Sequence, residues 1–109
     1  MMDWSQWIDF KKFDIGSAPT TSGVFCLRHH REVTYYGVAD GPGGIREQLL
    51  EHIDGKKGDC TRLANGYCYA ECDEPAEVVE RMLSLTVLRL GSPPRCNNGD
   101  TERVPRSDP

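Results

Sequence analysis

Four of the five cysteines, Cys60, Cys68, Cys72 and Cys96, are the side chains that first suggest metal chemistry. Structural zinc sites favour cysteine pairs separated by two to four residues, and Cys68 and Cys72 meet that spacing. The run Tyr67–Cys72 predicts a strand, however, and four residues along one face of a strand separate two thiols by about 13 Å. We therefore expect buried thiols packed beneath helices, and no zinc site.

The cysteines are also expected to be reduced. Their number is odd, and the N-terminal segment MMDWSQWIDFKKF contains acidic residues and lacks the apolar core of a signal peptide. Reduced thiols are the usual state in a chain without an export signal. No apolar run approaches the roughly 20 residues of a membrane helix. These features predict a cytoplasmic protein that does not bind or span a membrane.

The stretch GVFCLRHHREVTYYG, residues 23–37, would position any site on this chain. Gly23–Arg28 is an apolar alternating run, His29–Arg31 is a short polar break, and Glu32–Tyr36 is rich in β-branched and aromatic residues. Two such runs around a short break predict a β-hairpin.

Helices and one more strand follow the hairpin. Apolar residues in Ile45–Ile53 recur with helical spacing, and Asp59 is expected to cap a short helix over Cys60–Ala64. A strand over Tyr67–Cys72 precedes a helix that opens at Pro75 and ends before Gly91. The sequence predicts a single α/β domain with a three-stranded sheet flanked by helices.

Two terminal segments flank the domain, which spans residues 23–97. Residues 1–22 form an N-terminal arm, helical or extended, whose aromatic residues are expected to pack on the domain. Residues 98–109 hold one apolar residue, Val104, and predict a disordered tail. The aromatic residues of the arm are Trp4, Trp7, Phe10 and Phe13.

The 109-residue chain has 13 Lys and Arg against 17 Asp and Glu, a net charge of −4. Nonspecific nucleic-acid binding usually accompanies an excess of cations, because phosphate neutralisation supplies most of its affinity. Binding to nucleic acid would therefore need a local basic patch.

Gly23-Val24-Phe25 and Tyr35-Tyr36-Gly37 together resemble the paired motifs of the GIY-YIG nuclease superfamily. The order of the predicted elements is similar to that of this domain, and the last loop resembles its closing Pro-x-x-Asn motif. The resemblance covers Gly23–Asn97 and implies hydrolysis of DNA phosphodiesters with one divalent cation, Mg²⁺ or Mn²⁺. Such cations prefer oxygen ligands and can stabilise the charge that develops on the phosphate.

The resemblance assigns a catalytic phenol to Tyr35, whose alternative role is that of a half-buried strand residue. It also places Gly37 at the substrate. The family's Arg-Leu-x-x-His pattern aligns with Gln48-Leu49-Leu50-Glu51-His52, so His52 matches while Gln48 stands where arginine belongs. Both are candidate substrate-binding residues, and the alternative for His52 is a helix-end residue that interacts with carbonyls or the helix dipole. Arg46 is the nearest catalytic candidate, but two residues turn it about 200° around the helix. Its alternative is an exposed surface cation.

The metal-binding glutamate of the family falls near Ser84 or Leu85 in this sequence, and neither is a carboxylate. Glu80, one helical turn earlier, is the candidate catalytic residue and metal ligand, and Glu77 is a further candidate. Their alternative is that of surface charges on an amphipathic helix.

Three functions follow from these features. The first is a metal-dependent DNA endonuclease whose activity is weakened by Gln48. The second is a catalytically inactive GIY-YIG-like module that binds nucleic acid or protein. The third is a protein-interaction module that captures a partner through Trp4 and Trp7 of the arm.

Overall fold

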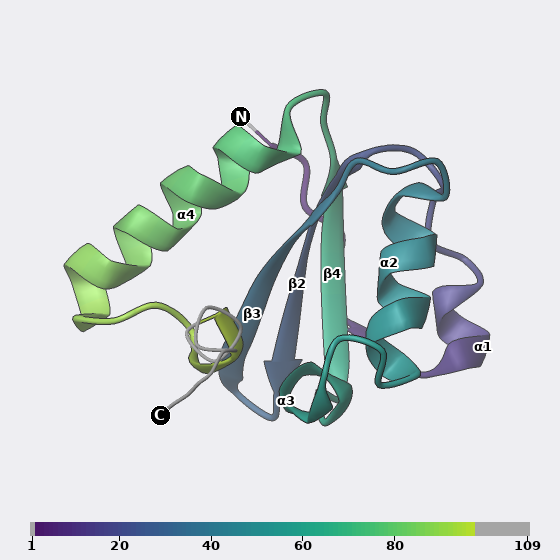
Figure 1. Ribbon diagram of the computed structural model, residues 1–109, viewed down its shortest axis with the longest axis horizontal. Coiled ribbons are helices and arrows are strands. Elements are labelled where there is room, and N and C mark those ends of the chain that lie inside the picture. The colour runs from purple at the N-terminus through teal and green to yellow at the C-terminus, as the bar shows by residue number, and fades with distance from the viewer. Residues whose placement is uncertain (1, 98–109) are drawn as a thin grey trace.

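The structure is a computed structural model that describes residues 2–97. A four-stranded sheet lies at its centre, with α1 and α2 on one face and α4 on the other (Figure 1). The predicted tail, residues 98–109, lies outside the described residues. In chain order the elements are β1 (Ile8–Asp9), α1 (Lys12–Ile15), β2 (Gly23–His29), β3 (Glu32–Ala39), α2 (Gly44–Ile53), α3 (Asp59–Arg62), β4 (Gly66–Glu71) and α4 (Pro75–Leu90).

The sheet is antiparallel with the strand order β1-β4-β2-β3, so the predicted number of three strands is wrong. The fourth strand comes from the N-terminal arm, where Ile8 pairs with Tyr67 at the edge of β4. Ser5 continues this contact, because its N–H donates to the Tyr69 carbonyl and its hydroxyl accepts from the Tyr69 N–H. The arm therefore covers one edge of the sheet, and β3 forms the opposite edge.

The predicted hairpin is present as β2 and β3, and both strands run further than predicted, to His29 and Ala39. His30 has a positive φ of 59° in the connecting turn. Its N–H donates to the side-chain oxygen of Asn65 at 2.9 Å, which ties the turn to the start of β4.

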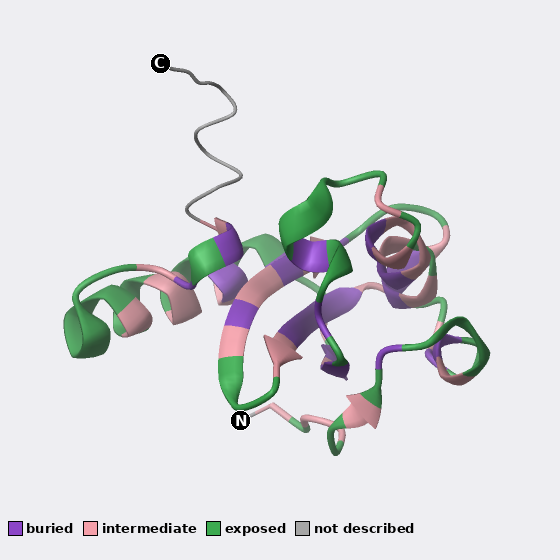
Figure 2. Cartoon of the chain, turned by 90° about the horizontal axis from the view of Figure 1, so that it is seen from below, coloured by how far each residue is buried: buried purple, intermediate pink, exposed green. Residues whose placement is uncertain are grey.

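Alternation along the strands separates the core into two layers. Phe25 and Leu27 of β2 pack toward α2, while Val24 packs toward Val79 of α4. On β4, Ala70 lies in the layer beneath α4 and Tyr67 in the layer beneath α2. β2 and β4 are largely buried, β3 alternates between buried and more exposed residues, and α4 is largely exposed (Figure 2).

Both long helices occur where the sequence predicts them. The first turn of α2 has no side-chain cap; instead the N–H groups of Ile45 and Arg46 donate to the carbonyls of Thr21 and Pro19. Gly91 ends α4 in the left-handed conformation, with φ 90°.

The predicted cap of the short helix α3 is wrong. The side chain of Asp59 makes no cap hydrogen bond and instead forms an ion pair with Arg62. Asp59 is the first residue of α3, and Gly58 occupies the N-cap position.

The arm runs extended from residue 2 to β1 and then forms the short helix α1. Trp4 packs in the layer beneath α4, and Phe10 is buried in the layer beneath α2. Phe13 is 91% exposed, so the expectation that it packs is wrong. Trp7 is partly exposed, and the guanidinium carbon of Arg28 lies 4.2 Å from its ring centroid.

Cys60 and Cys96 form a disulfide across 36 residues, so the prediction of five reduced thiols is wrong. The spacing of these cysteines gave no signal, because the fold brings α3 beside the segment after α4. Cys26, Cys68 and Cys72 are free, and Cys26 lies opposite Cys68 on adjacent strands. Their hydrogen bond lowers the pKa of the Cys68 thiol, and it raises the pKa of Cys26 together with burial.

Candidate functional site

Tyr35 belongs to an aromatic cluster on the α2 side of the sheet. Its ring centroid lies 5.0 Å from that of His52 on α2 and 6.0 Å from that of Phe25 on β2. Phe25 and His52 also contact each other edge to face, with centroids 5.4 Å apart. The fold thus brings two of the predicted site residues together, Tyr35 and His52.

Gly37 makes room for this cluster. A Cβ atom at position 37 would lie 2.2 Å from Cζ of Phe25, so the ring of Phe25 rests directly on the backbone of β3. Because Gly37 is buried beneath that ring, its visible role is packing rather than direct contact with a substrate.

His52 is 2% exposed, and its Nδ1 shares a 2.7 Å hydrogen bond with the hydroxyl of Thr61, which is also buried. Burial, assisted by the charge of Lys57, lowers the pKa of His52 to about 4. The imidazole is therefore neutral at pH 7 and offers no positive charge to a phosphate.

Arg46 lies at the start of α2, and its Nε–H donates to the carbonyl oxygen of Ala18 at 2.8 Å. This bond holds its side chain against the loop that precedes β2. Gln48 is half-buried on the same helix. The structure thus gives Arg46 a part in fixing the loop to α2.

Glu80 is exposed on α4, which covers the sheet face opposite Tyr35 (Figure 1). Its neighbour Val79 marks that face, because it packs against Val24 and Ala70. Glu77 is likewise exposed on α4. A cation held by either glutamate would be separated from Tyr35 by the sheet, so these residues do not fit the arrangement of one metal beside a tyrosine. Residues 2–97 contain no group of three or more His, Cys, Asp or Glu side chains placed to hold a metal ion.

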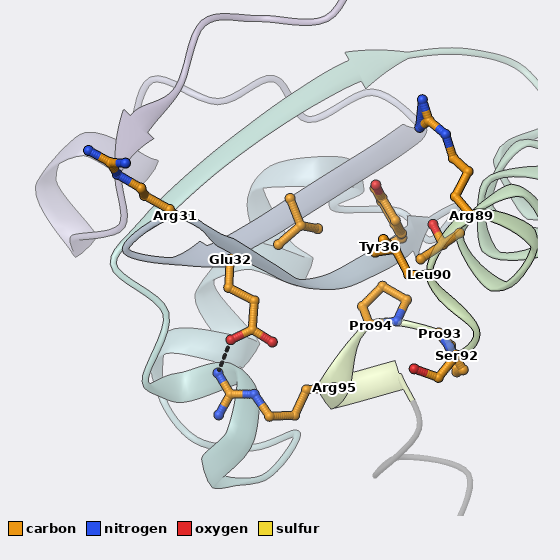
Figure 3. A pocket seen from close by; sticks show the side chains of 11 residues that line it. Arg31, Glu32, Tyr36, Arg89, Leu90, Ser92, Pro93, Pro94 and Arg95 are labelled. Atoms are coloured by element: carbon orange, nitrogen blue, oxygen red, sulfur yellow. Dashed lines mark hydrogen bonds and ion pairs between the residues drawn. The ribbon is translucent and has the colours of Figure 1, made fainter.

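A pocket of about 490 Å³ lies elsewhere, between β3, the last turns of α4 and the loop after Gly91 (Figure 3). Its volume falls within the range that is usual for ligand sites. The apolar part of its lining is provided by one strand residue, an aromatic ring, a leucine and two prolines: Val33, Tyr36, Leu90, Pro93 and Pro94.

Three arginines and one glutamate supply the charges of this pocket, which we call the arginine pocket. Figure 3 shows Arg31, Arg89 and Arg95 at separate places around it. Arg95 forms an exposed ion pair with Glu32 at 3.4 Å, whereas Arg31 and Arg89 pair with no carboxylate in residues 2–97. The pocket therefore has a positive balance on a chain whose net charge is negative.

Tyr36 links the strand to the helix at the arginine pocket. Its phenol interacts with the Thr86 hydroxyl of α4, and half-burial is the main cause that raises its pKa. The phenol therefore stays protonated at neutral pH and can act as a hydrogen-bond donor.

The wall of the arginine pocket opposite α4 is held in two ways. The backbone N–H of Tyr36 donates to the side-chain oxygen of Asn97 at 2.9 Å, and the Asn97 amide donates to the Tyr36 carbonyl at 3.1 Å. Cys96, fully buried, is bonded to Cys60 of α3. The segment that carries Pro94 and Arg95 is therefore fixed by a covalent bond and by strand-like hydrogen bonds.

The sequence reasoning missed this pocket. Arg31 is far from Arg89 and Arg95 in the chain, and no local run of cations marks the three arginines. The available signals were the Pro94–Asn97 motif and the polar turn of the hairpin, which contains Arg31.

No protein-family model, curated protein or solved structure matches this chain. In the part of the chain that the structure describes, no helix is long and apolar enough to cross a membrane.

Proposed function

We propose that this chain is a catalytically inactive GIY-YIG-like domain that binds nucleic acid. The observation that carries the proposal is the position of Glu80, on the sheet face opposite Tyr35. Phosphodiester hydrolysis of the kind implied by the resemblance needs a metal ligand and an active-site phenol at the same phosphate. A domain that carries the metal ligand on one sheet face and the phenol on the other could have a GIY-YIG-like fold and still lack the catalytic geometry.

The α2 side of the sheet supports the same conclusion. Gln48 lacks the charge that would stabilise a pentavalent phosphate, and the nearest arginine, Arg46, is bonded to the Ala18 carbonyl. Loss of one such charge-stabilising donor typically reduces a rate by about 10²- to 10³-fold. The neutral His52 does not compensate.

Nucleic acid is the ligand that the resemblance implies, and the arginine pocket supplies the local basic patch that such binding needs. Capture of a protein through the arm has less support. Trp4 packs inward, and Trp7 stacks with Arg28, so the two tryptophans do not form one exposed surface.

A cleavage assay tests the proposal against its competitor, a weak metal-dependent endonuclease. Single-stranded, duplex, nicked and branched DNA would be incubated with the protein in Mg²⁺ and in Mn²⁺. We expect binding without cleavage, and we expect Gln48→Arg to remain inactive because Glu80 stays on the other face. Metal-dependent cleavage that is lost in both Tyr35→Phe and Glu80→Gln would overturn the proposal. A chain that binds none of these DNA forms would overturn it as well.

A further inference from the structure

We infer that the arginine pocket binds an unpaired nucleotide of a single-stranded nucleic acid, with the arginines on the phosphates and the apolar lining against the base. This inference rests on the proposed function, because it takes nucleic acid to be the ligand. It adds the location of the site and the form of nucleic acid that the site accepts.

The positions of the cations indicate a ligand with several charges. Arginine binds phosphate oxygens through paired N–H donors. Arg31, Arg89 and Arg95 do not converge on one point (Figure 3), so a single phosphate would not reach all three. A strand that crosses the pocket presents successive phosphates, each of which can meet a different arginine.

The apolar lining indicates an unpaired base. Tyr36 and Pro94 lie between the arginines in the pocket (Figure 3), and Val33 also lines it. In a duplex the base faces are stacked inside the helix and cannot enter such a pocket, whereas a single strand can turn a base outward. Contacts to aromatic and apolar surfaces, together with cations along the backbone, are the usual way in which proteins hold single strands.

The pocket is preformed, and this favours binding because little ordering entropy is lost. Asn97 fixes one wall to β3 and the Cys60–Cys96 bond fixes the same segment to α3. Gly91 fixes the turn between that segment and α4.

An acidic peptide is the competing ligand for a set of arginines. Its carboxylates could pair with the arginines, but an acidic side chain has no flat ring that could stack on the surface formed by Tyr36, Pro93 and Pro94. The observations therefore favour the nucleotide, and the peptide serves as a comparison in the test.

The test measures binding of a fluorescent 12-nucleotide single strand by anisotropy, with its duplex and an oligoglutamate peptide as comparisons. Arg89→Ala should weaken binding about tenfold, the usual effect of losing one charge-assisted hydrogen bond. It should also reduce the slope of log K against log salt by about 0.7. Arg81→Ala is the matched control, because Arg81 is exposed on the same helix and does not line the pocket. It should change neither quantity.

Glu32→Gln is a second test, because it should strengthen binding, whereas a misfolded variant would bind less tightly. The carboxylate of Glu32 pairs with Arg95 and repels phosphate, so its removal should strengthen binding of the single strand.

The outcomes separate this inference from the proposed function. If the wild-type chain binds nucleic acid, but Arg89→Ala and Arg81→Ala behave alike, the pocket is the wrong site while the proposed function stands. If duplex binds as tightly as single strand, or if the peptide binds more tightly, the assignment to an unpaired nucleotide is overturned. If no nucleic acid binds, the proposed function fails and this inference fails with it.

Discussion

The side chain of Asn97 stands in for a strand partner of Tyr36, since its amide both accepts from the Tyr36 N–H and donates to the Tyr36 carbonyl. β3 is the outer strand of the sheet, and an open edge exposes backbone groups that can pair with another chain. Asn97, which directly follows the disulfide-bonded Cys96, therefore pairs with the backbone N–H and C=O of Tyr36 at this edge and closes the wall of the arginine pocket.

Replacing Asn97 by alanine should remove both hydrogen bonds. We expect the free energy of unfolding in urea to fall by about 1–3 kcal/mol, since each bond contributes about 0.5–1.5 kcal/mol. Arg95→Ala is the control from the same segment. Its ion pair with Glu32 is exposed, so its loss should change stability little. Equal effects of the two substitutions would show that Asn97 does not pair with β3.

The disulfide gives a thiol count that contradicts the sequence-based expectation. In denaturant without reductant, a thiol reagent should react with three cysteines, and after reduction with five. Cys60→Ser should give four reactive thiols without reductant, because Cys96 is released. We also expect this variant to lose about 4 kcal/mol of stability, the chain-entropy effect of a loop of this length. Five reactive thiols in the unreduced wild-type chain would contradict the disulfide.

This bond also bears on location. Disulfides persist mainly in oxidising compartments, whereas the location predicted from the sequence is the reducing cytoplasm. That location stays a prediction.

Gly37 and Gly41 provide a matched pair of glycines. Gly37→Ala should lower the free energy of unfolding by about 1–3 kcal/mol, because its Cβ would collide with the ring of Phe25 in the core. Gly41 has no atom within 4 Å of such a Cβ, so Gly41→Ala should stay within about 0.5 kcal/mol of the wild type. Chemical denaturation of the two variants measures the difference, and equal stabilities would show that the Phe25 ring does not rest on Gly37.

His52 should make stability depend on pH. Its folded-state pKa, about 4, lies below its ordinary value of 6.5, so the unfolded chain binds the proton more readily. The free energy of unfolding is therefore not reduced by His52 above pH 6.5, and it falls as the pH drops from 6.5 toward 4. The loss at pH 5 is about 2 kcal/mol.

Urea unfolding at pH 7 and pH 5 measures this effect. His52→Gln should lose less stability between these pH values than the wild type, because glutamine does not titrate. If His52→Gln keeps the wild-type dependence on pH, another group is responsible.

The sequence predicted those parts of the fold that periodicity marks. The hairpin, α2 and α4 each contain enough residues for apolar spacing to show, and Gly91 marks a helix end. β1 has two residues, which is too short for an alternating pattern, and it forms because the edge of β4 provides partners. Cys60 and Cys96 also meet through tertiary structure alone.

The candidate site could be predicted less well. Tyr35 and His52, which the resemblance assigns to one site, lie beside each other because their elements, β3 and α2, pack directly together. It could not tell which sheet face α4 covers, and that face decides whether Glu80 reaches Tyr35. The arginine pocket joins two segments that are distant in the chain, residues 31–36 and 86–95, so only the folded chain reveals it.

The separation of Tyr35 from Glu80 by the sheet is the central claim, and paramagnetic broadening by Mn²⁺ measures it most directly. Ring signals of Tyr35 and amide signals around Glu80 would be followed by NMR during a Mn²⁺ titration. We predict that concentrations that broaden the signals of Glu80 and its neighbours leave the Tyr35 ring sharp. Joint broadening of both sites at the same low Mn²⁺ concentration, abolished at both by Glu80→Gln, would place one metal between them and contradict the account.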